Sequence, residues 1–573
     1  MLRVFLNSAA VAALILSVSS VTPATAQSVA GPYLAARHAA VQSDYAVAAR
    51  YYAEALTHDP GNPELLESAA LSYVSLGEVE KALPLARKME ENGQKSQIAR
   101  LLMTAGLIAE GDYETLQARD ISGNGIGPWV EGLAKAWSFV GSGDMPRAIA
   151  AFDEMAKEGG IQSLVLYHKA MALASVGEFE QADTILGSDA AGAAARTRRG
   201  VMAHSEILSQ LGRNDDALML IRQNFGAETD PELDRLLEQL TADMPVPFTL
   251  IPDVRAGMAE VYFTFAAVLL SEQAGDYYTL LYARIARFLR PDHIDALLLT
   301  AGLLESLGQN NLAIAEYKAV PADHPAYHAA ELGRAAALRR MDQIDQAVEV
   351  LEQLARSHGA LPVVHSTLGD VLVRQNKFKE AIAAYSRALE LTTVEANSRW
   401  VLHYARGIAE ERSGDWESSE ADFRAALAIN GDQPQVLNYL GYSLVEQNRK
   451  LDEALEMIER AVAGSPSSGY IVDSLGWVYY RVGRYEEAVT QMERAVELLA
   501  VDPVVNDHLG DVYWAVGRAR EAQFQWRRAL SFVNKSDSDT EADPDRIRRK
   551  LEVGLDKVLQ EEGEPPLKVV NEL

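Results

Sequence analysis

Side chains suited to binding another molecule recur at helical spacing near the C-terminus. Steps of three and four residues follow the helical period, so these side chains share one face. Aromatic rings alternate there with short carboxylate or amide groups, and the candidate groove residues are Asn438, Tyr442, Tyr470, Asp473, Trp477, Tyr480, Asp507, Asp511 and Trp514. Rings supply rigid contact area, whereas Asn and Asp can hydrogen-bond a peptide backbone or a basic side chain. The pattern predicts capture of a peptide segment.

The same residues also have a structural interpretation. Acidic residues near the start of a helix stabilise its first turn, which would account for Asn438, Asp473 and Asp507. The rings would then pack between neighbouring helices. The residue pattern leaves both interpretations open.

We find no constellation of residues for catalysis or metal binding. His324 and His328 stand four apart but straddle Pro325 and lack a third ligand. The acidic run 537–543 begins like a calcium loop, but Ala542 stands where the sharp turn needs Gly. Phosphate-loop, zincin and serine-elbow motifs are missing from the sequence. We therefore expect a non-enzymatic protein with no catalytic residues, no metal and no cofactor.

Composition excludes several classes of partner and site. The chain has 53 Lys and Arg against 81 Asp and Glu, a net charge of −28 that repels nucleic acid. Hydrophobic residues make up 48%, enough to bury a core. With no Cys, the chain can form no disulfide, thiolate metal site or lipid anchor on cysteine.

The first residues resemble a secretory signal peptide. Met1–Gln27 holds one basic residue, Arg3, then an apolar stretch and the small residues Ala24 and Ala26 around Thr25. The alternative is a retained membrane anchor, but the apolar run is shorter than the roughly 20 residues of a span. We expect cleavage near Ala26 and a periplasmic protein.

A repeat of about 34 residues positions the candidate side chains. In each copy a small residue is followed twelve positions later by Ala and, in many copies, nineteen positions later by another Ala or an apolar residue. Two copies that lie 34 residues apart are Gly476, Ala488 and Ala495, then Gly510, Ala522 and Ala529. Small residues at this spacing allow helices to cross closely. Rings would fill the gaps between crossings, at Tyr52, Tyr317, Tyr385, Phe423 and Trp526.

The segment from Leu509 to Leu530 carries Leu-Gly, then Tyr513, Ala522 and Trp526, and resembles the tetratricopeptide repeat (TPR). That resemblance implies an all-α fold, a right-handed α-solenoid of about 14 TPR-type helical hairpins in two arms. Turns of the Gly-x-aromatic type would end first helices with a left-handed glycine.

Two interruptions of the period define the expected domains. They are a signal peptide at 1–26, an N-terminal TPR array at 27–226, an irregular connector at 227–256, a C-terminal array at 257–533, and an acidic joint with a capping helix at 534–573. The connector should hold one helix, Pro231–Ala242, before an extended stretch where the two arms meet. The final helix should run from Pro544 to Gln560, with the basic run 546–550 on a solvated face.

Over most of the mature chain, and most clearly from about Trp400 to Leu530, the sequence is similar to exported TPR proteins of Gram-negative bacteria. Some of these are outer-membrane lipoprotein adaptors that present cell-wall hydrolases to a carboxyl-terminal processing protease. The likeness implies a periplasmic scaffold whose partners are envelope proteins or peptides, among them a protease or a cell-wall hydrolase. Without Cys, this chain cannot be lipid-anchored as those adaptors are.

Other TPR domains hold a carboxylate with Lys and Asn in the groove. The corresponding positions here are Asn438, Asp473 and Asp507, so the resemblance does not carry that anion clamp over. We expect a basic or neutral peptide instead. The alternative function is an accessory subunit of a polysaccharide synthesis or export machine, in which the rings would stack on sugars.

Overall fold

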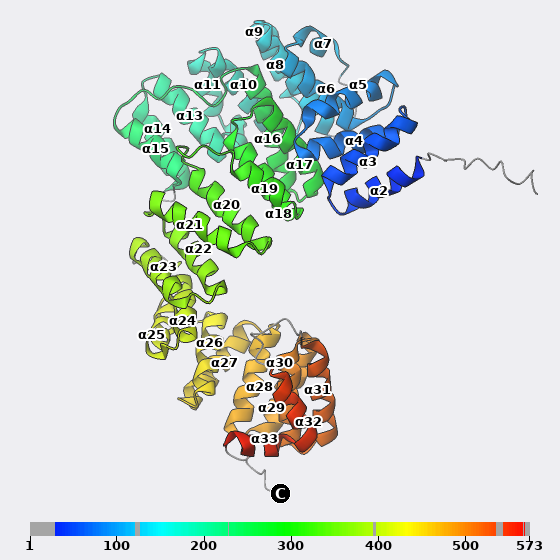
Figure 1. Cartoon of the computed structure of the whole chain (residues 1–573). Coiled ribbons are helices and arrows are strands. Elements are labelled where there is room, and N and C mark those ends of the chain that lie inside the picture. Colours follow the sequence, from blue (N-terminus) through cyan, green and yellow to red (C-terminus); the bar gives the residue numbers. More distant parts are fainter. Residues whose placement is uncertain are drawn as a thin grey trace, which may run out of the picture. The chain divides into compact units, whose positions relative to one another are not determined.

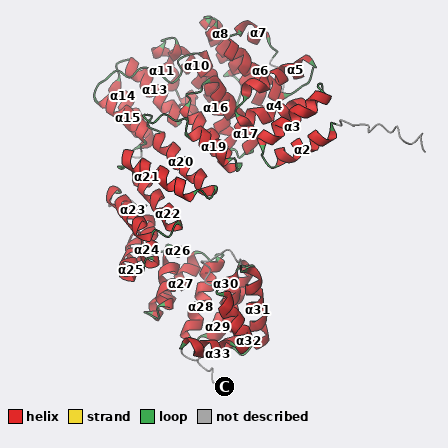
Figure 2. Ribbon diagram, viewed as in Figure 1, coloured by secondary structure: helices red, strands yellow, loops and turns green. Residues whose placement is uncertain are grey.

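The computed structural model describes residues 29–120, 126–226, 229–393, 397–533, 542–564 and 567. Every regular element among these residues is a helix (Figure 2). The expected all-α fold of stacked helical hairpins is confirmed. The predicted signal peptide and most of the acidic joint lie outside the described residues.

The chain divides into two compact units between Ala347 and Val348. Unit 1 contains the hairpins α2 (Ala30–Val41) with α3 (Tyr45–His58), α4 (Pro63–Leu76) with α5 (Val79–Glu91), α6 (Gln97–Glu110) with α7 (Tyr113–Ala118), α8 (Ile126–Gly141) with α9 (Met145–Met155), α10 (Gln162–Ser175) with α11 (Phe179–Leu186), α13 (Arg198–Gln210) with α14 (Asn214–Phe225), α16 (Val254–Ser271) with α17 (Asp276–Leu289), and α18 (Ile294–Ser306) with α19 (Asn310–Tyr317). It also holds η1 (Asp189–Ala191), α12 (Gly192–Ala195), α15 (Pro231–Thr241) and α20 (Tyr327–Arg340).

Helix α21 (Ile344–Ser357) contains the boundary. Unit 2 continues with the hairpins α22 (Pro362–Arg374) with α23 (Phe378–Leu391), α24 (Arg399–Arg412) with α25 (Trp416–Ile429), α26 (Pro434–Glu446) with α27 (Leu451–Gly464), α28 (Gly469–Val482) with α29 (Tyr485–Leu498), and α30 (Pro503–Ala515) with α31 (Ala519–Phe532). Helices α32 (Pro544–Val553) and α33 (Leu555–Glu562) follow.

Small residues and rings form the hairpins as predicted. A Cβ atom on Gly369 would lie 2.6 Å from the ring of Tyr385, and one on Gly510 would lie 2.4 Å from the ring of Trp526. Glycine at these positions lets the ring of the second helix pack against the backbone of the first. Gly483 ends α28 at φ 85°, in the left-handed region that glycine tolerates.

Helices α16 and α17 fold back onto the first hairpins of unit 1, beside α4, α6 and α8 (Figure 1). The Tyr262 hydroxyl donates to the carbonyl oxygen of Leu101 at 2.7 Å, and Arg284 donates to that of Ser75 at 3.0 Å. One apolar core runs from Tyr45 to Ala330. By length and composition α16 could span a membrane, but much of it is buried in this core.

The division at Ala347 therefore differs from the boundary expected at 227–256. Helix α15 ends one residue before the predicted end, and an extended stretch follows it as expected. However, α13 before this stretch and α16 after it contribute to one core. The reason is that α16 is apolar around most of its circumference and must be covered on several sides.

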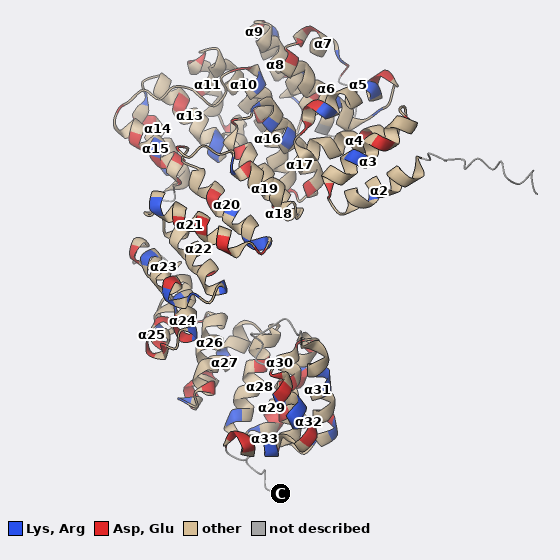
Figure 3. Cartoon of the chain, viewed as in Figure 1, with Lys and Arg blue, Asp and Glu red and all other residues tan. Residues whose placement is uncertain are grey.

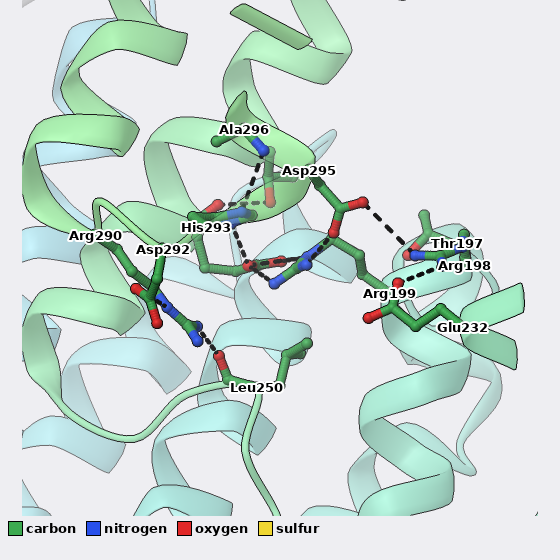
Figure 4. A network of polar contacts seen from close by, with 12 residues as sticks. Thr197, Arg198, Arg199, Glu232, Leu250, Arg290, Asp292, His293, Asp295 and Ala296 are labelled. Atoms are coloured by element: carbon green, nitrogen blue, oxygen red, sulfur yellow. Dashed lines mark hydrogen bonds and ion pairs between the residues drawn. The ribbon is translucent and has the colours of Figure 1, made fainter. Parts of the chain in front are cut away.

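A buried polar network also fixes this connector (Figure 4). Arg199 on α13 donates to Glu260 on α16 at 2.6 Å and pairs with Asp295 on α18. Arg290 donates to the carbonyl oxygen of Leu250 within the connector. Burial alone would raise the pKa of Glu260, but the charge and hydrogen bonds of Arg199 hold it well below its usual range. Charge pairing thus ties α13 to the helices beyond the connector.

The C-terminal end of the chain forms two helices where one was expected. Asp543 accepts a hydrogen bond from the backbone N–H of Asp545 and Pro544 opens α32, as predicted. Gly554 then breaks the helix at φ 83°, and its Cα approaches the Trp514 ring so closely that a Cβ would lie 2.5 Å away. This bend places α33 against the side chain of Trp514.

Candidate binding cavity in unit 2

The first helices of successive hairpins present the predicted groove residues. Pro434 opens α26 and Pro503 opens α30, positions at which proline's missing N–H costs no helical hydrogen bond. Asp502 caps α30 by accepting from the backbone N–H groups of Val504 and Val505 at 2.9 and 3.1 Å. These starts fix which face of each helix carries the predicted residues.

A cavity of about 1030 Å³ opens between α24, α26, α28 and the start of α30. Its lining includes the predicted residues Asn438, Tyr442, Tyr470 and Asp473. The Tyr470 ring is 60% exposed, and its hydroxyl donates to Asp502 at 3.2 Å. Part of the predicted groove therefore forms a real hollow large enough for several side chains of a bound segment.

The cavity lining is acidic. Its charged residues are Glu411, Arg412, Glu446, Asp473 and Asp502, of which only Arg412 is basic. Over the helices of both units, by contrast, acidic and basic residues are interspersed (Figure 3). The cavity lining thus concentrates acidic side chains with one basic residue among them.

Trp477 and Tyr480 pack between repeats behind this cavity. The Trp477 ring stacks on Tyr480 with centroids 4.9 Å apart and on His508 with centroids 4.1 Å apart. Its Nε1 donates to Glu446 at 2.6 Å. Both rings are buried, so for this pair the packing interpretation of the sequence is the better one.

Asp473 forms a contact with His508 of the next hairpin. His508 Nδ1 donates to Asp473 Oδ2 at 3.0 Å. Burial alone would lower the pKa of His508, but the charge and hydrogen bond of Asp473, helped by Asp507 and Asp511, raise it to about 9. The pair is an ion pair at neutral pH, and Asp473 makes a contact between repeats instead of stabilising the first turn of its own helix.

Asp507 and Asp511 do not line an open groove, because Lys550 of α32 covers them. The Lys550 ammonium lies 2.9 Å from both oxygens of Asp507 and 2.7 and 2.8 Å from those of Asp511. Burial raises the pKa of Asp507, and the Lys550 charge opposes this effect. The expectation that residues 546–550 form a solvated face is therefore wrong for Lys550, whose side chain has no exposed surface.

Trp514 is covered by the same C-terminal helices. Its Nε1 donates to Asp556 of α33 at 2.9 Å, and its ring contacts Gly554. The structure therefore separates the nine predicted groove residues into three groups, of which the buried pair Trp477 and Tyr480 is one. Asn438, Tyr442, Tyr470 and Asp473 line the cavity, whereas Asp507, Asp511 and Trp514 hold the chain's own C-terminal helices.

Comparison with protein families decides the class of this fold. One model described as "Tetratricopeptide repeat" matches residues 33–96, 332–396 and 404–469, and a second with the same description matches residues 471–499. These segments of the chain are tetratricopeptide repeats.

A distant relative matches part of this chain. TPR repeat-containing protein PA4667 of Pseudomonas aeruginosa is 29% identical over 157 residues, which cover 27% of this chain and 26% of that protein. The match thus spans about a quarter of the relative's length.

Solved structures of similar fold include one titled APC/C hetero-tetramer Cut9-Hcn1 and yeast Tom70. The first is 16% identical with a TM-score of 0.38, covering 92% of this chain and 97% of that one. Tom70 is 12% identical with a TM-score of 0.33, covering 93% and 96%. YrrB, titled a TPR protein with an unusual peptide-binding site, is 19% identical with a TM-score of 0.27, covering 33% and 95%.

Sequence reasoning missed several lining residues of the TPR protein's cavity. Tyr439 follows Asn438 directly, and Glu446 lies one position beyond the end of the stripe on α26. If the predicted binding face of α26 had been taken one residue wider, it would have included both Tyr439 and Glu446. Glu411 comes from the preceding hairpin, which the stripe did not cover.

Proposed function

We propose that this TPR protein is a non-catalytic scaffold that binds a segment of another protein in the cavity of unit 2. The observation that carries the proposal is the cavity itself, where the rings of Tyr439, Tyr442 and Tyr470 stand among hydrogen-bonding groups on the first helices of adjacent repeats. Repeat arrays use such surfaces for extended ligands. Rigid rings and buried polar groups are the features that anchor a bound segment.

We also propose that the protein acts outside the cytoplasm on envelope partners, among them a protease or a cell-wall hydrolase. The composition of Met1–Gln27 supports export. Fractionation followed by N-terminal sequencing tests this proposal. A mature chain that starts near Gln27 in the periplasmic fraction is the expected result, and an intact Met1 in the cytosol contradicts it.

Photo-crosslinking tests the binding proposal directly. Benzoylphenylalanine replaces Tyr470, at the cavity edge, or Phe524 on α31, whose ring is similarly exposed at 62% but lies outside this cavity. Irradiation of cells of the source organism should give a protein adduct from position 470 and none of the same mass from position 524. Identical adducts from both sites, or none from 470, contradict the proposal. An adduct whose added mass is removed by glycosidase favours the polysaccharide alternative.

A further inference from the structure

Successive hairpins of unit 2 are joined by an acid on one first helix and a cation from the next element. Asp473 on α28 receives a hydrogen bond from His508 on α30 at 3.0 Å. Asp507 on α30 receives two from Lys550 on α32 at 2.9 Å. Both cationic groups are buried, so the interior of this array already holds two cations among carboxylates.

The preceding hairpin has the same register but no cation. Asn438 stands two residues before a Leu-Gly pair, as Asp473 and Asp507 do. The residue that corresponds to His508 is Ser474, whose hydroxyl donates within its own helix to the carbonyl oxygen of Tyr470 at 3.0 Å. Asn438 Oδ1 is buried and has no hydrogen-bond partner among the described residues. Both Asn438 and Ser474 line the cavity.

Charge and shape at this position suit a cationic side chain. The other lining residues include the acids Glu411, Glu446 and Asp502 against the single base Arg412. A buried carbonyl oxygen without a donor is costly, and a ligand that supplies an N–H group removes that cost. Tyr439, Tyr442 and Tyr470 add rings on which the aliphatic stem of a Lys or Arg can lie.

We infer that the cavity binds the ammonium or guanidinium group of a Lys or Arg from the bound segment. Within the same array, carboxylates already bind His508 and Lys550 in a comparable way. This inference rests on the proposed function and names the ligand chemistry of that cavity. Asn438 Oδ1 accepts from the cation, and the lining carboxylates, Glu446 among them, supply negative charge to the cavity. Recognition of a cationic side chain sets this site apart from a groove built to hold a carboxylate.

Fluorescence anisotropy with peptide pools tests the inference on the full mature chain. Each pool consists of fluorescein-labelled 12-residue peptides with random uncharged flanks and one fixed central residue, which is Lys, Arg, norleucine or Glu. The Lys and Arg pools should bind about tenfold more tightly than the norleucine pool, and the Glu pool most weakly.

Three variants localise the effect. Glu446→Gln removes the charge but keeps an oxygen for the Trp477 N–H, and should weaken the Lys pool roughly three- to tenfold. Asn438→Asp should tighten it by a similar factor. Glu456→Gln changes the net charge equally on an exposed part of α27 that does not line the cavity, and should leave binding unchanged.

The outcomes separate this inference from the proposed function. Equal binding of the Lys and norleucine pools, or equal effects of Glu446→Gln and Glu456→Gln, overturns the inference and leaves the cavity a peptide site. Failure of every pool to bind overturns the inference and the proposed function together.

Discussion

The Lys550 ammonium lies 2.9 Å from both carboxylate oxygens of Asp507, in the interior of unit 2. The lysine comes from the C-terminal helix α32, and the aspartate from the first helix of the last hairpin. A buried pair of this kind becomes strongly destabilising when one partner is removed, because the other is left charged and unpaired. The pair therefore locks the end of the array to its C-terminal helices.

Replacing Lys550 tests whether this ion pair holds α32 against α30. Lys550→Met should lower the free energy of local opening of α30 and α32 by about 3–5 kcal/mol, since it removes the main cation of the buried carboxylates Asp507 and Asp511. Hydrogen exchange read by mass spectrometry over residues 503–553 measures this change. Arg548→Met, on an exposed face of the same helix, is the matched control. Adding Asp507→Asn and Asp511→Asn to Lys550→Met should recover much of the protection, and equal effects of the two single variants would contradict the assignment.

The His508 pair predicts a loss of stability at alkaline pH. The folded-state pKa is about 9, above the unfolded value near 6.5, so the native state binds the extra proton. The stabilisation is complete below about pH 6.5 and is lost as pH rises through about 9, by on the order of 3 kcal/mol. Urea unfolding followed by circular dichroism at pH 6.5 and 9.5 measures it. A His508→Gln variant should show a smaller difference between the two pH values, and an unchanged difference would exclude His508 as the source.

Two helical glycines should respond in opposite directions to alanine. A methyl group at Gly510 meets the buried Trp526 ring at 2.4 Å, so Gly510→Ala should cost about 1–3 kcal/mol through overpacking. Gly302 lies inside α18 with no atom within 4 Å of an added Cβ. Gly302→Ala should therefore stabilise the protein by about 0.5–1 kcal/mol. The melting temperatures of both variants and of the parent protein, measured by calorimetry, test this expectation. Shifts of the same sign would refute the packing argument.

The polar network around Glu260 should hold the connector in place. Arg199→Met leaves Glu260 buried without its main cation, and the expected cost is about 3–5 kcal/mol. Faster hydrogen exchange of residues 242–253 is the specific readout, because the network joins the helices on both sides of that stretch. Arg222→Met, at an exposed position on α14, should leave exchange there unchanged. Protection of the connector that survives Arg199→Met would show that packing alone fixes it.

The hairpins were predictable because the residues that hold each of them together lie close to one another in the sequence. A small residue and the ring that packs on it, such as Gly369 and Tyr385, belong to one repeat, so their spacing recurs along the chain. The return of α16 and α17 to the first hairpins was not predictable in this way. Its contacts join residues such as Tyr262 and Leu101, which lie 161 positions apart and belong to different repeats.

The candidate site was predictable only where the ligand-facing side chains stay uncovered. Asn438, Tyr442, Tyr470 and Asp473 line the cavity as the stripe predicts. Asp507 and Asp511 share that stripe, but the cation that covers them lies 43 and 39 residues later, beyond the end of the repeat pattern. Periodicity within the repeats carries no information about such a residue.

The return of α17 to the first hairpins constrains the order in which unit 1 can be completed during synthesis. Most repeat arrays can fold progressively, because each repeat contacts only its neighbours. Here Ser75 receives Arg284, which leaves the ribosome 209 residues later. Until then the apolar faces of α4 and α6 are exposed, and contacts of such long sequence separation form slowly. Unit 1 can therefore be completed only after α17 has been synthesised, even if the hairpins before it have already formed.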